Sequence, residues 1–501
     1  MDVKWEVALK SVARFLMLFA VMVMAFGCYW VRNKFGEITW EQLLFHLQIA
    51  EDGLADADAG LIRSFVRQMG WALLVTILLM IPIRGYASVG RGVSWCLDYC
   101  RLGVRKGYLA ARDWRVLALM LAGTLLFAGE TFGALGMLER SDKGELFGKH
   151  YVDPSAVELQ AHGRRNLVLV YVESLEEAYA NAKIFDRNLL KDLQELPPPP
   201  AGSKIAFSDM YQSVGTGWTI AGIVSTQCGV PLHSVLLGDG NRQGEMVSKF
   251  MPGATCLSDV LKHHGYRNVF MHGPYNAFAG VGTFMRTHSY DEVYDRELWQ
   301  QRYASQHING WGLYDADLLN EGSKKFDDLV KKKQPFNLTL LTIDTHGPDG
   351  FLSPECQSMG YRGFNGVVEC TASHVAKFVR HVQASPAAKN TTIVVMGDHL
   401  AMRNPVSDIL AKTERRRVFN LLLTPERMNP VIGSVSRFDM LPTMLAAMGW
   451  EIPQNKLGLG YNAFSSEAAG RSKDWQQQLE VIAGNKSPRY LALWREHVSK
   501  E

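Results

Sequence analysis

The sequence lacks several features that would assign it to a common class of protein. Its charges almost cancel, with 53 Lys and Arg against 50 Asp and Glu, so there is no basic excess of the kind that nucleic-acid binding uses. It contains no repeat of fixed period and no long disordered tract. It also has no G-x-S-x-G motif, the elbow that carries the serine of many hydrolases. We therefore expect no nucleic acid among its partners and no serine hydrolase of that type.

Long apolar runs are confined to residues 1–138, and the rest has the composition of an ordinary soluble protein. Three runs predict membrane spans at about residues 12–31, 67–84 and 116–138, because about 20 apolar residues cross a hydrocarbon core of roughly 30 Å. The first run has no small-residue cleavage site, which favours an anchor over a removed signal peptide. The second run is short enough for a buried core helix, but Arg67 and Arg84 flank it and can snorkel to the two interfaces.

The segments between these runs differ in charge. The segment after the second run is basic, with Arg91, Arg101, Arg105, Lys106, Arg112 and Arg115. The segment after the first run is acidic, with Glu37, Glu41, Glu51, Asp52, Asp56 and Asp58. Loops rich in Lys and Arg stay in the cytoplasm. The pattern therefore predicts a cytoplasmic N-terminus and an extracytoplasmic location for everything after Leu138.

Three parts follow from this reading: a transmembrane anchor at 1–138, a polar connector at 139–165 and an extracytoplasmic catalytic domain at 166–501. The last part contains four of the seven cysteines, Cys228, Cys256, Cys356 and Cys370. An even number in an oxidising compartment predicts two disulfides. Four cysteines allow three pairings, and proximity along the chain favours Cys228–Cys256 and Cys356–Cys370.

In the large domain, short apolar runs alternate with helical patterns. Four runs have the continuous apolar character of strands buried on both faces: Asn166–Val172, Asn268–Met271, Leu338–Ile343 and Thr392–Met396. Helical patterns lie between and after them, among them Leu257–His264, Val367–Val382 and Met440–Met448. This alternation predicts an α/β fold in which helices cover both faces of a sheet.

Groups that can bind a metal ion or transfer protons follow all four predicted strands. They are Glu173-Ser174, His272, Asp344-Thr345-His346 and Asp398-His399. In open α/β sheets, ligands bind beyond the carboxyl ends of the strands. Each group alone is more often a turn, a helix cap or a structural histidine. Their coincidence after four strands predicts a single site.

A hydroxyl flanked by glycines precedes a further helical pattern. The segment Ser213-Val-Gly-Thr-Gly-Trp-Thr219 leads into the apolar run Ile220–Thr226, so Thr216 is expected at or beside a helix N-terminus. The N–H groups and the dipole there favour an anion such as phosphate, although an N-cap is the commoner role of such a threonine. A threonine hydroxyl needs a base or a metal to ionise it. The candidate activator is a metal ion held by Glu173, Asp398 and His399.

These segments resemble the alkaline-phosphatase and sulfatase superfamily, in the branch that contains the lipoteichoic acid synthases and the phosphoglycerol transferases of osmoregulated periplasmic glucans. The similar segments are VLVYVESLE, SVGTGWTIAGIVSTQCGVPL, THSYDEVYD, WGLYDADLL and VVMGDHLA. The resemblance covers most of residues 165–450. It implies a multi-pass protein of a bacterial inner membrane, with an alkaline-phosphatase-like α/β domain in the periplasm.

The resemblance also implies roles for individual residues. The metal ligands would be Glu173, Thr216, Asp398 and His399, with Thr216 as the nucleophile. His346 resembles the histidine that contacts the transferred phosphate in the lipoteichoic acid enzymes. His272 begins a His-Gly-Pro-Tyr stretch similar to theirs, which implies a position in the pocket. A donor set that is mostly oxygen favours Mn²⁺ or Mg²⁺ and also permits Zn²⁺.

The sequence departs from the lipoteichoic branch in one respect. Those enzymes carry a Trp and an Arg that bind glycerol phosphate shortly after the His-Gly-x-Tyr stretch, and the equivalent positions here are Ala279 and Val281. The headgroup contacts of that branch therefore do not transfer to this chain. Recognition of the donor must be built differently.

The implied reaction transfers glycerol phosphate from phosphatidylglycerol in the bilayer to a periplasmic glucan or another saccharide. Thr216 would form a covalent intermediate, with release of diacylglycerol. One alternative is a phosphoethanolamine transferase of the same superfamily. Another is a catalytically inactive membrane protein that binds lipid or glycan. A sulfatase is disfavoured, because Thr216-Gly-Trp-Thr does not provide the C/S-x-P-x-R motif of those enzymes.

Overall fold

The computed structural model describes residues 3–36, 59–80, 113–132, 144–233, 248–472 and 474–495. The chain divides into two compact units. The smaller unit comprises Met1–Trp40 and Asp58–Gly136, and the larger comprises Glu41–Ala57 and Met137–Glu501.

Within its described residues, the smaller unit consists of the helices α1 (Val3–Phe35), α4 (Ala59–Met80) and α6 (Trp114–Thr131). Helix α1 packs against both α4 and α6. The segments Leu9–Phe35 and Ile62–Met80 are long and apolar enough to cross a membrane, by length and composition. Helix α6 is not among these candidate spans, so a third span stays a prediction.

The second helix differs from the apolar run that predicted it. Helix α4 begins at Ala59, so Arg67 lies inside the helix rather than at its edge. The reason is that Ile62, Phe65 and Val66 continue the apolar pattern across the arginines. The acidic segment and most of the basic segment fall at 37–58 and 81–112, outside the described residues. The predicted topology therefore stays a prediction.

The larger unit is built around a seven-stranded sheet with the order β3-β9-β8-β2-β7-β5-β6. The four predicted strands are its centre: β8 (Thr391–Gly397), β2 (Asn166–Val172), β7 (Phe336–Leu341) and β5 (Arg267–His272). All four are parallel to their neighbours in this group. The strand β6 (Glu292–Tyr294) extends this parallel set beside β5.

The other edge of the sheet was not predicted. There β9 (Asn420–Thr424) pairs antiparallel with β8, and β3 (Ser203–Ile205) pairs antiparallel with β9. The sheet is therefore mixed, not entirely parallel. Strands β3 and β9 have only three and five residues, too few to show a clear hydrophobic period.

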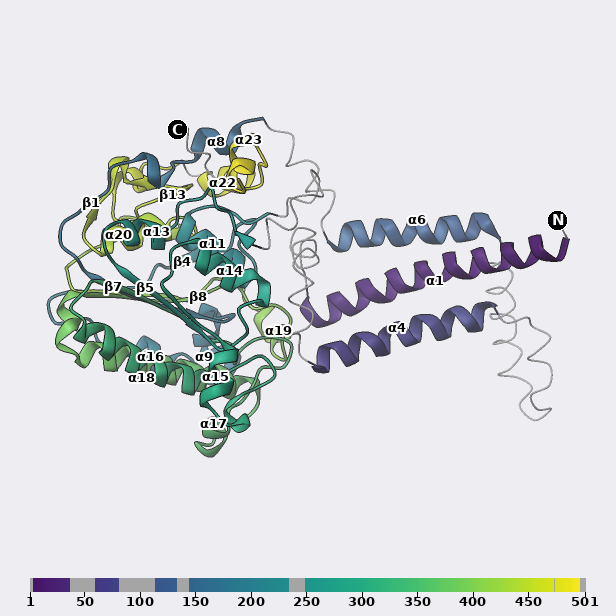
Figure 1. The fold of residues 1–501 in the computed structure, drawn as a ribbon, viewed down its shortest axis with the longest axis horizontal. Helices are drawn as coiled ribbons and strands as arrows, with labels where there is room; N and C mark the ends of the chain where they lie inside the picture. Colours follow the sequence, from purple (N-terminus) through teal and green to yellow (C-terminus); the bar gives the residue numbers. More distant parts are fainter. Residues whose placement is uncertain are drawn as a thin grey trace. The chain divides into compact units, whose positions relative to one another are not determined.

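Helices cover both faces of this sheet, as Figure 1 shows. One face packs against α16 (Asp315–Lys331) and α18 (Gly363–Ala384), and the other packs against α11 (Thr219–Cys228), α13 (Leu257–His263) and α20 (Met440–Ala447). Side chains of β2 alternate between the two resulting cores, with Val168 and Val170 in one and Leu167 and Leu169 in the other. The predicted α/β fold is confirmed.

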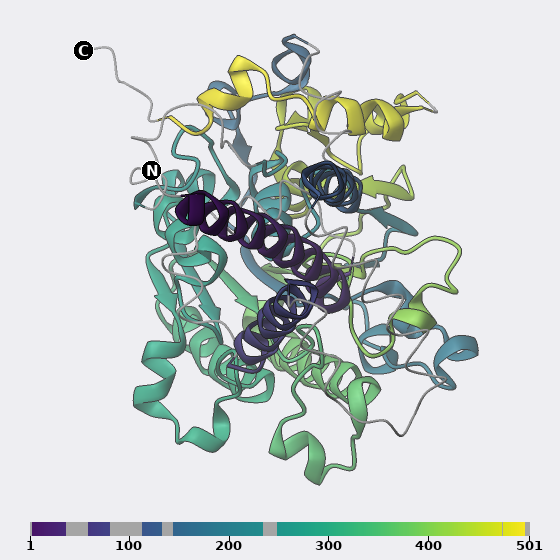
Figure 2. The same cartoon turned by 90° about the vertical axis from the view of Figure 1, so that its right-hand side faces the viewer.

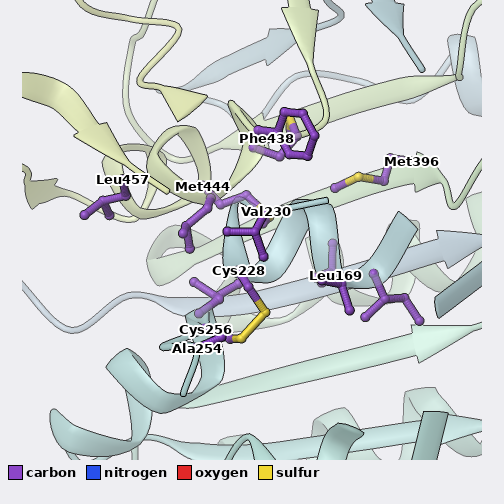
Figure 3. Close-up of a cluster of buried hydrophobic side chains, with 14 of the residues drawn as sticks. Leu169, Cys228, Val230, Ala254, Cys256, Met396, Phe438, Met444 and Leu457 are labelled. Atoms are coloured by element: carbon purple, nitrogen blue, oxygen red, sulfur yellow. A yellow bond between two sulfur atoms is a disulfide. The ribbon is translucent and has the colours of Figure 1, made fainter. Parts of the chain in front are cut away.

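Both predicted disulfides are present. Cys228–Cys256 joins the last residue of α11 to the residue that precedes α13, and Cys356–Cys370 joins α17 (Pro354–Ser358) to α18. Figure 3 shows the first disulfide inside the apolar core, among side chains such as Val230 and Ala254. This bond fixes the C-terminal end of α11. The N-terminal end of the same helix follows Thr216.

The C-terminal segment is part of the larger unit. Helices α22 (Trp475–Ala483) and α23 (Pro488–Ala492) pack against α8 (Leu146–His150), and Figure 1 and Figure 2 both draw them side by side. Their apolar side chains Leu479, Ile482 and Tyr490 are buried in the core. The tail is therefore a packed part of the larger unit.

Candidate active site

Three of the predicted metal ligands converge at the carboxyl edge of the sheet. Val172 of β2 pairs with Gly397 of β8, so Glu173 and Asp398 are the next residues of two adjacent parallel strands. His399 Nε2 lies 3.4 Å from Glu173 Oε1 and 3.5 Å from Asp398 Oδ2. One ligand atom from each of these residues lies within 4.8 Å of the other two, and all three side chains are fully buried.

The hydrogen bonds of this cluster leave atoms available for a cation. Asp398 Oδ1 accepts the N–H groups of Ser174 and His399, at 2.7 and 2.8 Å. In the described part of the chain, Asp398 Oδ2 and His399 Nε2 have no hydrogen-bond partner. His399 Nδ1 lies 2.7 Å from the carbonyl oxygen of Leu400, to which it donates, so Nε2 is the ring nitrogen that remains for a cation. Buried polar atoms without a partner are rare, and these face each other as ligands of one ion would. The residues fit a divalent cation.

The electrostatics of the cluster agree with that fit. Burial raises the pKa of Glu173, but the positive charges of His399 and His346 outweigh it and lower the pKa to about 2. Burial and the charge of Glu173 raise the pKa of Asp398 to about 7. Burial opposes the charge of His399, yet the two carboxylates raise its pKa to about 9. The raised pKa values of Asp398 and His399 mean that a metal ion bound by this cluster would compete with protons.

Thr216 lies in a turn that precedes α11. Its hydroxyl donates to the carbonyl oxygen of Ser213 at 2.7 Å, and its N–H donates to the same oxygen at 3.2 Å. Gly215 has a φ of +73°, a left-handed conformation that favours glycine. Helix α11 starts at Thr219, so Thr216 stands just before the helix and not in its first turn.

Both flanks of this turn are hydrogen-bonded to the segments that contain Glu173, Asp398 and His399, the three residues called the metal cluster below. Before the turn, Gln212 Oε1 accepts the N–H of Leu400 at 2.7 Å, directly after His399. After the turn, Thr219 Oγ1 donates to Glu173 Oε2 at 3.4 Å. The structure therefore brings the buried Thr216 turn alongside the three ligands.

Two residues that were not expected from the sequence hold α11 against β8. A Cβ at Gly222 would lie 1.9 Å from the carbonyl oxygen of Asp398, so only glycine permits this close approach. The buried Arg437 donates to the carbonyl oxygens of Gly397 and Gly222, at 2.9 and 3.2 Å. Burial lowers the pKa of Arg437 to about 10. The role of Arg437 could not be predicted from the sequence, because no motif or periodic pattern around it indicates a buried arginine.

His346 follows β7 and contacts two aromatic rings. Its ring centroid is 4.5 Å from that of Trp311 and 6.0 Å from that of Phe278. Its Nδ1 lies 2.7 Å from the carbonyl oxygen of Gly347. A positive charge on His346 lowers the pKa of Glu173, so the imidazole is close enough to that carboxylate to interact with it electrostatically. Its predicted contact with the transferred phosphate stays a prediction.

The hydrogen bonds of the described residues do not join His272 to the three ligands. His272 is buried at the end of β5, with Nε2 3.3 Å from Asn276 Oδ1, and burial lowers its pKa to about 3. Ala279 and Val281 are buried apolar residues, so neither supplies a polar contact to a headgroup.

Asp344 belongs to a supporting network and not to the metal cluster. Its Oδ1 accepts Asn309 Nδ2 at 2.8 Å, and its Oδ2 accepts the N–H of Asp315 at 3.1 Å. Asp315 in turn accepts the N–H of Ile343 at 2.7 Å. The network fixes the loop that leads to His346. Asn309 and Asp315 were not expected. Asp315 ends the Trp-Gly-Leu-Tyr-Asp segment, and Asn309 lies two residues before that segment.

Known proteins resemble this chain in sequence and in fold. A family model described as Sulfatase matches residues 165–450. Phosphoglycerol transferase I of Citrobacter koseri is 34% identical over 393 residues, which are 76% of this chain and 49% of the relative. The protein of the same name from Shigella boydii is 34% identical over 398 residues, 77% of this chain and 50% of the relative. The chain thus spans about half the length of the curated relatives it matches.

Among solved structures, the lipoteichoic acid synthase LtaP from Listeria monocytogenes has a TM-score of 0.48 at 16% identity, covering 64% of this chain and 80% of that one. A protein of the alkaline phosphatase superfamily from Vibrio parahaemolyticus has a TM-score of 0.46 at 20% identity, covering 65% and 77%. The family model includes every strand from β2 to β9 and all three residues of the metal cluster. The chain belongs to the sulfatase family.

Proposed function

We propose that this protein is a membrane-bound, metal-dependent phosphoglycerol transferase that moves glycerol phosphate from phosphatidylglycerol to a periplasmic glucan or another saccharide. The observation that carries the proposal is that the buried Thr216 turn is hydrogen-bonded on both flanks to the segments that contain Glu173 and His399. Beside Glu173, Asp398 Oδ2 and His399 Nε2 have no hydrogen-bond partner in the described structure. The names of the relatives at 34% identity support the same chemistry.

In this proposal Glu173, Asp398, His399 and Thr216 hold a divalent cation, with Mn²⁺ or Mg²⁺ favoured by the oxygen donors and Zn²⁺ permitted. Such an ion, when bound, favours ionisation of a coordinated hydroxyl and neutralises charge on the phosphate. Thr216 Oγ1 forms a bond to phosphorus, the bond from phosphorus to the diacylglycerol oxygen breaks, and that oxygen takes up a proton. His346, whose Nδ1–H is held by the Gly347 carbonyl oxygen, would steady the phosphate or donate that proton through Nε2.

The second half of the reaction reverses the first with a different alcohol. A hydroxyl of the saccharide acceptor loses its proton and attacks the phosphorus, and the bond to Thr216 breaks. Thr216 recovers its proton, and the product is a phosphodiester between glycerol and the saccharide. Two successive displacements at one nucleophile predict ping-pong kinetics.

We propose a bacterial inner-membrane location with a periplasmic catalytic domain and a cytoplasmic N-terminus. Two helices with the length and composition of membrane spans support it, as do two disulfides in the larger unit. A phosphatase reporter fused after Glu139 should be active, and one fused near Arg105 should be inactive. The reverse pattern would overturn the orientation.

The decisive test is Thr216→Ala in the full chain, assayed with labelled phosphatidylglycerol and detection of diacylglycerol. We expect loss of turnover with the fold retained, and residual activity in Thr216→Ser, which keeps a hydroxyl. Wild-type protein incubated without acceptor should carry a glycerol-phosphate mass on the peptide that contains Thr216. Release of diacylglycerol by Thr216→Ala at a near wild-type rate would contradict the covalent mechanism.

A parallel assay with labelled phosphatidylethanolamine separates the proposal from a phosphoethanolamine transferase. Transfer of ethanolamine phosphate, and not of glycerol phosphate, would replace the proposed donor. Binding of either lipid without any transfer would identify an inactive binding protein.

A further inference from the structure

The C-terminal helices reach the turn that carries Thr216. Glu480, near the end of α22, accepts the N–H of Val214 at 2.9 Å through Oε2. Val214 is two residues before Thr216, inside the turn whose hydrogen bonds converge on the carbonyl oxygen of Ser213. A carboxylate is a strong acceptor for a backbone N–H, because the bond is charge-assisted. The tail therefore has a direct contact with the backbone of the turn.

A second path joins the tail to the same turn from the other side. The hydroxyl of Tyr490 accepts the N–H of His233 at 2.8 Å and donates to the carbonyl oxygen of Pro231 at 3.2 Å. Between them, the N–H of Leu232 donates to the carbonyl oxygen of Gly215 at 2.9 Å. Tyr490 thus fixes the segment Pro231–His233, and Leu232 of this segment is hydrogen-bonded to Gly215, the residue before Thr216.

The turn packs tightly against the segment that follows α11. A Cβ at Gly215 would lie 2.7 Å from the Cβ of Pro231, so the turn and the segment after α11 are in close contact. A displacement of either segment is therefore transmitted to Thr216. The turn has little freedom to adjust on its own.

The tail is itself fixed on its far side. The N–H of Phe147 in α8 donates to Asn485 Oδ1 at 2.9 Å, and the rings of Phe147 and Tyr490 meet edge to face at 5.4 Å. Arg489 Nη2 donates to Asp153 Oδ2 at 2.7 Å. The tail is held between α8 and the Thr216 turn, so it can act as a rigid support.

From these contacts we infer that α22 and α23 form a clamp that sets the position of Thr216, with Glu480 as a positioning residue. The inference rests on the proposed function in one respect, the role of Thr216 as nucleophile. The clamp contributes no group to the chemistry. It holds the hydroxyl at the angle and distance at which the attack on phosphorus takes place, and a misplacement of about 1 Å can cost on the order of 100-fold in rate.

The test compares Glu480→Ala with Glu480→Gln in the full chain, reconstituted in vesicles that contain phosphatidylglycerol. Alanine removes the acceptor, whereas the amide oxygen of glutamine can still accept the Val214 N–H. We expect Glu480→Ala to lower kcat for diacylglycerol release by roughly 10- to 100-fold with KM within about twofold of wild type. Glu480→Gln should restore kcat to within about threefold. The control is Gln478→Ala, an exposed residue of the same helix, which should behave as wild type.

A second readout does not need turnover. Hydrogen exchange of the peptide around residues 211–218, measured without substrate, should be faster in Glu480→Ala than in wild type and Glu480→Gln. Exchange in β2 should not change, which shows that the fold is intact. Equal exchange around Thr216 in all variants, or the same loss of kcat in Glu480→Gln and Glu480→Ala, would overturn the clamp. If wild type itself transfers no phosphoglycerol, the proposed function fails, and the exchange rates still decide the clamp.

Discussion

Two groups of buried acids lie at the same edge of the sheet, one in the proposed metal site and one in a hydrogen-bond network that supports a loop. In the first group, Glu173 and Asp398 stand beside His399, and in the second group Asp315 and Asp344 support the loop before His346. Burial does not distinguish them, because all four carboxyl groups are inside the protein. The pKa does not separate Asp398 from Asp344 either, since burial and a neighbouring carboxylate raise the pKa of both.

Hydrogen bonding distinguishes Asp398 from Asp315, whereas both oxygens of Glu173 accept hydroxyl groups, from Ser174 and Thr219. Asp315 accepts the N–H groups of Ile343 and Asp344 and the hydroxyl of Thr371, so both of its oxygens are used. Asp398 uses one oxygen on backbone N–H groups and directs the other, without a hydrogen-bond partner in the described structure, at the cluster. Asp315, which supports a loop, thus has both oxygens hydrogen-bonded, and Asp398, the proposed metal ligand, leaves one oxygen for a cation.

The largest expected effect is that of Asp398→Asn. The amide oxygen can still accept the N–H groups of Ser174 and His399, but a neutral nitrogen replaces the anionic oxygen that faces the cluster. Loss of a residue that merely supports a ligand costs roughly 10- to 100-fold in metal affinity, so loss of a ligand should cost at least about 100-fold. Metal analysis of the purified protein and the transfer assay should both record the loss.

The same variant tests whether Asp398 has a structural role. A chelator should lower the Tm of wild type and leave that of Asp398→Asn unchanged. Without metal, the variant should be at least as stable as wild type, because one of two repelling carboxylates is gone. An Asp398→Asn protein that retains its metal ion would erase the distinction between the two groups of acids.

The identical substitution at Asp315 should have the opposite outcome. One oxygen becomes an amide donor that faces either the N–H of Ile343 or the N–H of Asp344 and the hydroxyl of Thr371. A buried donor facing a donor should lower the free energy of unfolding by about 2 kcal/mol, measured by chemical denaturation. The metal content should remain that of wild type. Loss of metal with full stability would assign Asp315 to the ligand cluster.

A carboxylate paired with cations should give the smallest effect. Partial burial raises the pKa of Glu292, but hydrogen bonds from Lys325, Tyr294 and Arg267 outweigh it and lower the pKa to about 2. The folded state therefore binds this proton less tightly than the unfolded state does. The resulting stabilisation is complete above the ordinary pKa of a glutamate, near 4.5, and is lost as the pH falls toward 2.

Glu292→Gln should accordingly lower the free energy of unfolding by about 1 kcal/mol or less at pH 7, because the ion pairs of Glu292 with Lys325 and Arg267 are in contact with solvent. The difference from wild type should shrink when the same denaturation is measured at pH 3. A difference that is equal at both pH values would exclude the charge of Glu292 as its cause.

The sequence by itself determined those features of this protein that depend on residues close together along the chain. The four central strands were predictable because each is a continuous apolar run, and strands buried on both faces need such a run. The meeting of Glu173, Asp398 and His399 followed, since parallel strands bring their carboxyl ends to one edge. The disulfide pairs were also predictable, because their partners are only 28 and 14 residues apart.

Only the tertiary structure decided the contacts between distant segments. Thr219 reaches Glu173 across 46 residues, Arg437 joins Gly222 to Gly397, and Glu480 reaches Val214 across 266 residues. No periodic pattern reveals these contacts, because a hydrogen bond between remote segments requires only one donor and one acceptor. Which turn of α22 meets the Thr216 turn depends on how α8, α23 and the segment after α11 pack together. That packing is a property of the whole domain, so no stretch of the sequence contains it.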